Sequence, residues 1–195
     1  MLDFKGAKKY IINRLEKDLN PSLHYHGLHH TLDVYEVSTE IAKSEGISDE
    51  DTILLNTAAL YHDAGFLFRY LNNEVSAVKL VKDILPLFGY KTAQIKIIAE
   101  IILTTRIEKR PQTLLEKIMC DADYDYLGRG SEETLKIADT LSKELSENGF
   151  PFTDEEWNSI QLKFLKKHEY YTESSLKLRR PYKLEYYDYI KCSKA

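Results

Sequence analysis

Apolar residues recur at intervals of three and four along almost the whole chain, and runs of alternating β-branched residues are scarce. This spacing places apolar side chains on one face of an α-helix, whereas a half-buried strand needs strict alternation. The pattern therefore predicts an all-α fold. The 195 residues suit one ordinary domain, and neither a repeat nor a linker divides them. We expect a single helical bundle over residues 1–195.

Turn and capping residues place the ends of the expected helices. Pro21 ends the first helix, because the residue before a proline disfavours helical dihedral angles. Gly46 stands at a C-terminal cap position, and Ser48 stands at an N-cap. The helix after Ser48 is apolar on most sides, which is typical of a helix buried in the middle of a bundle. The expected helices cover about 4–19, the stretch from the histidine-rich residues 24–30 to Gly46, 52–63, 73–85, 92–105, 112–127, 132–147 and 154–168.

The C-terminal segment of about 150–195 is expected to be helical and rich in tyrosine. Its tyrosines alternate with lysines and arginines from about residue 166 onward. One interpretation is an amphipathic segment that packs its rings on the domain and leaves the hydroxyls at the surface. The other is a lid that supplies cations to an anionic substrate or to a partner subunit.

Charge and cysteine content limit the functional classes. A formal net charge of −4 and a pI near 5.9 argue against a nucleic-acid polymer as partner, because such proteins carry a basic surface. Cys120 and Cys192 are far apart, so no disulfide framework is expected. The apolar stretch 95–103 is too short to cross a membrane, and residues 1–5 lack the basic-then-apolar layout of a signal peptide. We therefore expect a cytoplasmic protein without a membrane partner.

Histidine and aspartate cluster in three segments. Four of the six histidines fall within residues 23–30, and neutral imidazole is a common ligand of divalent transition metals. His62 and Asp63 close the apolar third helix, where an imidazole and a carboxylate are costly to bury without a partner. A divalent cation is one such partner; a helix-terminal His beside a solvated Asp is the other interpretation.

Helical geometry narrows the candidates around these segments. His26 and His30 are four residues apart, so on a helix they project from the same face. Asp121, Asp123 and Asp125 compete for one further position, because alternate residues on a helix point about 200° apart. The remaining two histidines of the cluster, His24 and His29, are expected to cap the helix or to face solvent.

The order His30, then His62-Asp63, then Asp123 on a helical core resembles the H…HD…D signature of the HD superfamily of metal-dependent phosphohydrolases. The resemblance spans roughly residues 23–128. Residues 25–34, YHGLHHTLDV, are similar to the Y-H-N-x-x-H-x-x-D-V stretch of the cyclic-nucleotide phosphodiesterase branch, and residues 58–65 are similar to its A-x-x-H-D segment. Gly27 stands where that branch has asparagine, which leaves cyclic-nucleotide specificity open.

The resemblance implies roles for particular residues. His30, His62, Asp63 and Asp123 correspond to the metal ligands of the family, which favours Asp123 over its two neighbours. His26 corresponds to the general acid of the phosphodiesterases. Asp63 could also act in catalysis by bridging to a second ion. The ion is expected to be divalent: Mn, Fe, Zn, Ni or Mg, with the two histidines making a purely Mg²⁺ site less natural.

The expected activity is hydrolysis of a phosphate ester of a nucleotide, or of another small phosphorylated metabolite, by metal-activated water. Arg106, Arg129 and Lys183 are candidates for binding the substrate phosphate. Alternatives are a cyclic-nucleotide phosphodiesterase specifically, a non-catalytic nucleotide-binding regulatory module, and a helical interaction domain with incidental histidines. The expected partner is a small phosphorylated molecule, foremost a nucleotide, and a homodimer is left open.

Overall fold

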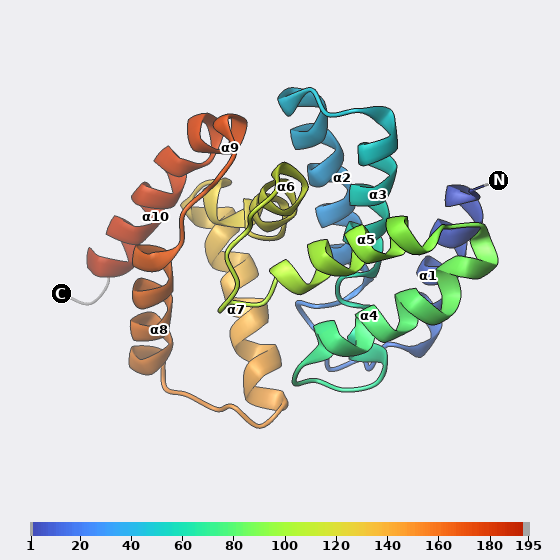
Figure 1. The fold of residues 1–195 in the computed structure, drawn as a ribbon. Coiled ribbons are helices and arrows are strands. Elements are labelled where there is room, and N and C mark those ends of the chain that lie inside the picture. The colour runs from blue at the N-terminus through green and yellow to red at the C-terminus, as the bar shows by residue number, and fades with distance from the viewer. Residues whose placement is uncertain (1, 193–195) are drawn as a thin grey trace.

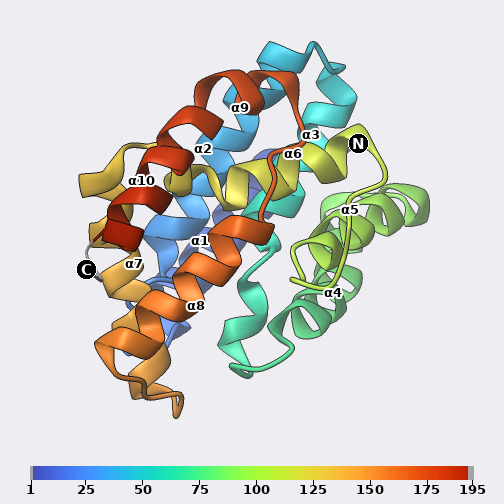
Figure 2. The same cartoon turned by 90° about the vertical axis from the view of Figure 1, so that its left-hand side faces the viewer.

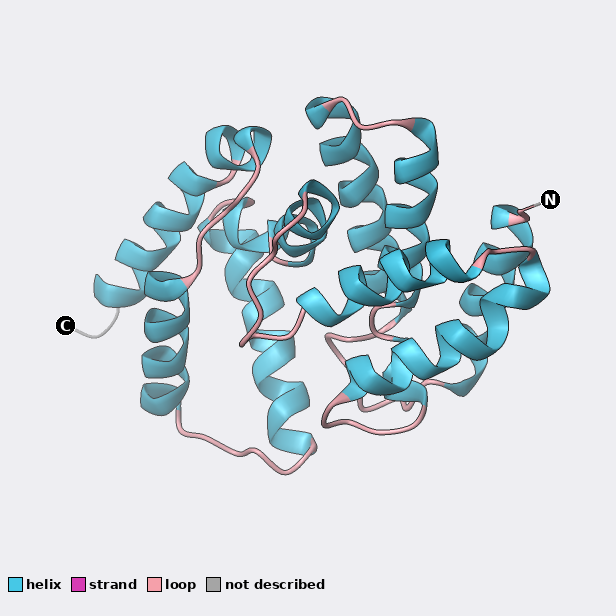
Figure 3. Cartoon of the chain, viewed as in Figure 1, coloured by secondary structure: helices cyan, strands magenta, loops and turns pink. Residues whose placement is uncertain are grey.

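A computed structural model describes residues 2–192, and the described chain forms α-helices and short 3-10 helices without any strand (Figures 1 and 3). This confirms the all-α fold class. The α-helices are α1 (Phe4–Asp18), α2 (Leu28–Glu45), α3 (Asp49–Tyr61), α4 (Asn73–Ile84), α5 (Thr92–Thr104), α6 (Leu114–Asp123), α7 (Ser131–Glu147), α8 (Asp154–Lys167), α9 (Glu173–Leu178) and α10 (Arg180–Cys192). The 3-10 helices are η1 (Ala64–Leu67), η2 (Leu85–Phe88) and η3 (Asp125–Gly128).

The main core surrounds α3. Every residue from Leu54 to Tyr61 is buried, and α3 packs against α1, α2, α5 and α6. A continuous buried run of this kind requires neighbours on all sides of the helix. The sequence pattern therefore predicted the position of α3 correctly, and its C-terminal end carries His62 and Asp63 into the interior.

A second, smaller core joins the C-terminal helices to the rest. It contains Tyr25, Tyr126 and Leu127 beside Leu165 of α8 and Tyr186 of α10. Figure 2 shows α8 and α10 running side by side, and α10 also contacts α7 and η3. The tyrosine-rich segment thus packs rings on the domain, as one of the two interpretations expects. The hydroxyls of Tyr170 and Tyr186 do not lie at the surface, however, because they donate to the carbonyl oxygen of Tyr124 and to Oε1 of Gln161.

The turn after His62-Asp63 depends on Gly65. A Cβ on this residue would lie 1.7 Å from the carbonyl oxygen of Asn73, at the start of α4. Only glycine allows so close an approach of two backbones. The contact of η1 with α4 therefore fixes the path of the backbone directly after His62 and Asp63.

The spacing predicts one helix over about 112–127, but α6 ends at Asp123. Tyr124 leaves helical dihedral angles (φ −106°, ψ 16°), and η3 follows. Gly128 then packs so closely on Arg179 that an added Cβ would lie 2.5 Å from the Cβ of Arg179. The continuous helix is wrong, because docking of the C-terminal segment decides the path here. Among the described residues, no helix combines the length and apolar character needed to cross a lipid bilayer.

Candidate metal centre

Four side chains from three helix ends meet in the interior. His30 lies in the first turn of α2, His62 and Asp63 follow the last residue of α3, and Asp123 ends α6. The Nε2 atom of His30 is 3.2 Å from Oδ1 of Asp123 and 3.5 Å from Oδ2 of Asp63. The Nε2 atom of His62 is 3.0 Å from Oδ2 of Asp63 and 3.6 Å from Oδ1 of Asp123. Two imidazole nitrogens and two carboxylate oxygens thus converge.

This cluster satisfies the spacing that a metal ion needs. His30, His62 and Asp123 each offer one ligand atom, and these three atoms lie within 4.8 Å of one another. Both histidines and Asp63 are buried. The three groups could therefore hold a metal ion, and the contacts of Asp63 with both imidazoles place its carboxylate beside them.

His62 is oriented as a metal ligand. Its Nδ1–H donates to the carbonyl oxygen of Ala59 over 2.8 Å, so Nε2 is the nitrogen that faces the cluster and could coordinate an ion after losing its proton. A hydrogen bond of this kind fixes the tautomer of ligating histidines. Within the described chain, Nε2 of His62 and Oδ2 of Asp63 are buried and have no hydrogen-bond partner of good geometry. Two unpaired polar atoms side by side are costly, and a divalent cation would satisfy both.

The charge balance of the cluster also favours a cation. Burial alone would lower the pKa of His62, but the carboxylates of Asp63 and Asp123 outweigh burial and raise it to about 9. Burial alone would raise the pKa of Asp63, but the histidines outweigh burial and lower it. The carboxylates therefore draw positive charge into the site, and a mixed nitrogen and oxygen donor set suits a first-row transition metal.

His26 lies beside the cluster and is held by Glu144 of α7, a residue that the sequence analysis missed. The carboxylate accepts hydrogen bonds from Nδ1 of His26, from the backbone N–H of Tyr25 (2.7 Å) and of His26 (2.9 Å), and from the hydroxyl of Tyr70 (3.1 Å). The His26 ring also stacks on Phe66, with 4.5 Å between centroids. Burial opposes protonation of His26, but the bond to Glu144 and the nearby carboxylates raise its pKa.

A sequence signal for Glu144 existed. In the sequence, Glu144 lies three residues after Leu141 and next to Leu145, on the apolar face of α7. The structure shows this charged side chain fully buried. A carboxylate on the apolar stripe of an amphipathic helix breaks the pattern, and such a residue is usually paired. The signal identifies a buried carboxylate but not its partner, since His26 is 118 positions away.

The two aspartates that compete with Asp123 have other partners. Asp121 accepts hydrogen bonds from the backbone N–H groups of Tyr171 and Thr172 and from the hydroxyl of Thr172. Asp125 binds Arg129 and Arg179 through its two oxygens. Both therefore attach neighbouring segments to the helix end, whereas Asp123 joins the cluster.

Arg129, a predicted substrate-binding residue, is occupied by carboxylates. Its Nε is 2.7 Å from Asp125, one terminal nitrogen is 2.8 Å from Asp33, and the other is 3.4 Å from Glu133. These contacts join α2 to η3 and α7. Binding of substrate by Arg129 stays a prediction, and the contacts support a structural role.

We expect the Arg129→Ala substitution to lower the free energy of unfolding by about 1–3 kcal/mol, because it removes charged hydrogen bonds to the buried Asp125. Urea unfolding followed by circular dichroism measures this. The KM for a hydrolysed substrate should not change. A raised KM at full stability would instead show that Arg129 contacts the substrate.

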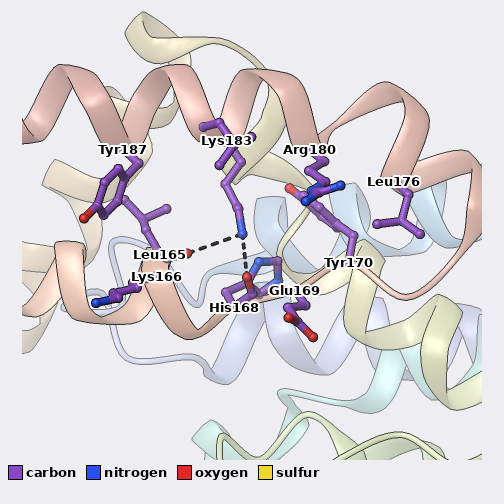
Figure 4. Close-up of a pocket in the computed structure, with 10 residues that line it drawn as sticks. Leu165, Lys166, His168, Glu169, Tyr170, Leu176, Arg180, Lys183 and Tyr187 are labelled. Atoms are coloured by element: carbon purple, nitrogen blue, oxygen red, sulfur yellow. Dashed lines mark hydrogen bonds between the residues drawn. The ribbon is translucent and has the colours of Figure 1, made fainter.

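The other two predicted cations lie elsewhere. Lys183 of α10 points into a cavity between α8 and α10 (Figure 4), where its Nζ donates to the carbonyl oxygens of Leu165 and His168. Those carbonyls belong to the end of α8, so the ammonium caps that helix, and burial lowers the pKa of Lys183. Arg106 follows α5 with its Nε 3.8 Å from Glu108. Contact of either residue with a substrate stays a prediction.

A cavity of about 300 Å³ adjoins the cluster, and both His26 and Asp123 line it. We call it the apolar cavity, because most of its wall is aromatic or aliphatic. That wall comes from residues near η3 and from α7, α8 and α10, and includes Tyr124, Tyr126, Leu141, Trp157, Ile160 and Phe164. The cluster of histidines and aspartates therefore has room beside it for an organic group.

Comparisons with known proteins concern the family and the fold of this chain. The family model described as HD domain matches residues 27–126. The crystal structure of Bacillus subtilis YpgQ superposes with a TM-score of 0.65 at 17% identity, covering 97% of this chain and 96% of that one. The complex of YpgQ with ADP gives a TM-score of 0.63 at 16% identity, covering 98% and 97%.

A third structure, a predicted HD superfamily hydrolase from an uncultured Thermotogales bacterium, gives a TM-score of 0.54 at 22% identity, covering 84% of this chain and 89% of that one. At these identities the structural likeness concerns the fold. A comparison with curated proteins gave no match.

Proposed function

The chain belongs to the HD domain family, and from this premise we propose that it is a metal-dependent phosphohydrolase. Its substrate would be a phosphate ester of a nucleotide or of another small phosphorylated metabolite. The single observation that carries the proposal is the convergence of His30, His62 and Asp123 in the interior, with Asp63 in contact with both imidazoles.

The cluster residues would hold a divalent ion. Bound there, the ion would lower the pKa of a coordinated water, orient the phosphoryl group and neutralise developing charge. His30 and His62 supply nitrogen donors, and Asp63 and Asp123 supply oxygen donors. The burial of both histidines and of Asp63 strengthens their electrostatic contacts, while Asp123 lines the cavity through which water and substrate reach the site.

His26 would supply the proton for the leaving oxygen. Because Glu144 accepts the Nδ1 proton, protonated His26 carries its second proton on Nε2. Its side chain keeps 22% exposure and lines the apolar cavity, so a substrate can reach it. The raised pKa of His26 keeps the acid form populated to higher pH than an ordinary histidine.

A nucleotide-binding module without turnover is a second candidate. The observation in its favour is the ADP complex of the structural neighbour YpgQ, together with the apolar cavity beside the cluster. Such a module would bind a nucleotide and yield no product on long incubation.

The proposal is tested on the full chain, stripped with a chelator and then supplied with Mn²⁺, Ni²⁺, Zn²⁺, Fe²⁺ or Mg²⁺. We expect at least one ion to raise the melting temperature, because an ion that binds only the folded state at 100 times its Kd adds about 2.7 kcal/mol of stability. The same ion should restore hydrolysis of a panel of phosphomonoesters and phosphodiesters, assayed by phosphate or nucleoside release.

The controls separate the candidates. Asp123→Asn should lose the metal-dependent rise in melting temperature, while Asp83→Asn, an exposed carboxylate of α4, should retain it. Metal binding without any product would favour the nucleotide-binding module. The absence of any metal-dependent change in the unsubstituted protein would refute the metal-dependent phosphohydrolase.

A further inference from the structure

A second cavity lies between α8 and α10 (Figure 4), and we call it the C-terminal cavity. Its volume is about 540 Å³, within the range of pockets that bind small organic ligands. Residues 165–170 form one wall, and Leu176 of α9 with one face of α10 forms the other. No member of the cluster of histidines and aspartates lines this cavity, so its chemistry has to be explained separately.

The charges of the C-terminal cavity are unbalanced. Three cations line it: Lys166, Arg180 and Lys183. Its carboxylate is Glu169, and within the described chain none of these four side chains forms an ion pair. By contrast, the neighbouring Arg179 binds the carboxylate of Asp125 over 2.6 Å. The cavity therefore carries an excess of positive charge, which attracts an anion.

Lys183 is the buried member of this set. It is only 6% exposed, and lysine is rarely buried to this extent without an ionised partner. Its Nζ donates to the carbonyl oxygens of Leu165 and His168, and an ammonium group has a third N–H donor. The ring of Tyr170 lies 6.0 Å from Nζ, at the distance limit of a cation–π contact. The positive charge of Lys183 is thus left without a counter-ion among the described residues.

The electrostatics of this wall favour a bound anion. Burial lowers the pKa of Lys183, Glu169 opposes this change, and Arg180 adds to it. His168 contributes no charge, because burial and the ammonium of Lys183 lower its pKa to about 3. An anion beside Lys183 would stabilise the charged ammonium and so reduce the cost of burying it.

Arg180 lies three residues before Lys183, and residues at this spacing are neighbours on one helix face. Figure 4 shows both side chains projecting from α10 toward the segment that follows α8. A guanidinium offers parallel N–H donors that match two phosphate oxygens, and an ammonium adds a compact point charge. Aromatic and aliphatic side chains line the same cavity, among them Tyr170, Leu184 and Tyr187.

We propose that the C-terminal cavity is a second binding site, which holds the phosphate group of a small phosphate monoester between Arg180 and Lys183 and the organic part of that ligand against the apolar wall. The site needs no metal ion and does not rest on the proposed function. Arg180 and Lys166 are exposed, so a ligand can reach the cavity from solvent.

Phenyl phosphate, a monoester with a small apolar group, is a suitable probe. Calorimetry on the chelator-treated full chain at physiological ionic strength should give a saturable heat. The same ligand should raise the melting temperature, because it binds only the folded state. Phenol, which lacks the phosphate, should do neither. The absence of a saturable heat with phenyl phosphate, or equal binding of phenol, would overturn the proposal.

A matched pair of arginine variants tests the location. Arg180→Ala should weaken phenyl phosphate binding about 10-fold, because it removes charged hydrogen bonds to the phosphate. Arg110→Ala removes the same charge from an arginine that does not line the cavity, and it should leave the affinity unchanged. Both positions are exposed, so neither substitution disturbs the core. Equal affinities of the two variants would refute the site.

Lys183→Met tests the buried ammonium, because it keeps a long apolar stem and removes the charge. We expect binding at least as weak as in Arg180→Ala, with circular dichroism confirming that the variant is folded. Unchanged affinity in a folded Lys183→Met protein would exclude Lys183 from the site. The arginine pair remains decisive if Lys183→Met does not fold.

His26→Gln separates this site from the proposed catalytic centre. The substitution should lower hydrolysis but leave the affinity of the metal-free protein for phenyl phosphate unchanged. Weaker binding in His26→Gln together with unchanged binding in Arg180→Ala would place the phosphate at the cluster and refute the second site. Absence of metal-dependent hydrolysis would refute the phosphohydrolase and leave the C-terminal cavity as an anion site.

Discussion

Asp63→Asn should lower kcat/KM for any hydrolysed phosphate ester about 10³-fold, a loss of about 4 kcal/mol of transition-state stabilisation. The amide keeps the size of the side chain but removes the negative charge that contacts both imidazoles at 3.0 and 3.5 Å. His62→Ala should lower kcat/KM as much, because it deletes the imidazole whose Nε2 faces the cluster. The hydrogen bond from Nδ1 to the carbonyl oxygen of Ala59 holds that ring in place. Steady-state assays and metal analysis of the purified variants measure both effects.

The two variants should differ in stability, which makes the prediction sharper. His62→Ala leaves the buried Asp63 carboxylate without its closest partner, so the metal-free protein should unfold more easily by about 3–5 kcal/mol. Asp63→Asn also removes one partner of the pair, and the lowered pKa of Asp63 means that the fold favours its charged form. Its metal-free protein should therefore be destabilised too, but by less, because His62 can remain buried as a neutral imidazole. Both should lose the stabilisation by metal. Full turnover in either variant would exclude the proposed mechanism.

Glu144→Gln should lower kcat about 10²-fold, the usual contribution of a general acid. In this variant the glutamine Nε2 would lie opposite Nδ1 of His26 and would donate a hydrogen bond, so Nδ1 would have to accept it. The negative charge of Glu144, which favours protonation of the imidazole, would be lost. Since Glu144 raises the pKa of His26, its neutralisation lowers that pKa. The alkaline limb of the pH–rate profile should therefore move to lower pH, which a purely structural role would not produce.

Glu144→Ala should also destabilise the fold, by about 3–5 kcal/mol. It removes the acceptor of two backbone N–H groups and of the Tyr70 hydroxyl, and Glu144 itself is fully buried. The matched control is Glu147→Gln on the same helix. Glu147 pairs with His24 at the surface, with 44% exposure, and its loss should cost less than about 1 kcal/mol. Equal effects of Glu144→Gln and Glu147→Gln on the pH profile would contradict the role of Glu144.

Local rules were sufficient for most of the helical framework. The ends of α1, α4, α5, α7 and α8 lie within one or two residues of the expected ranges, because capping and periodicity depend on neighbours in the sequence. Two helices differ more: α3 begins at Asp49, three residues before the expected start at 52, and the expected helix over 112–127 ends early. The early end of α6 follows from packing of Gly128 on Arg179, 51 positions further along the chain, and no local pattern contains that contact.

Some features of the candidate site were predictable from the sequence, and others depend on contacts between distant segments. The sequence order of histidine and aspartate identified the segments that meet, and the buried end of α3 indicated where they meet. It did not identify Glu144 as the partner of His26 or the apolar cavity beside the cluster. Arg129 looked like a phosphate ligand because its charge is visible in the sequence, whereas its carboxylate partners on α2 and η3 are visible only after folding.

The amino-acid sequence by itself determined that this chain is helical, that α3 is its central helix, and that imidazoles and carboxylates lie at helix ends. These properties follow from the period of apolar residues and from the cost of burying polar groups, which act over a few residues. The resemblance to the HD signature favoured Asp123 as the aspartate that meets the histidines. Tertiary structure alone decided the partners of the other two: Asp121 binds backbone amides, and Asp125 binds arginines. The physical reason is that the rotation of a helix end is set by all the helices packed against it, and no segment carries that information alone.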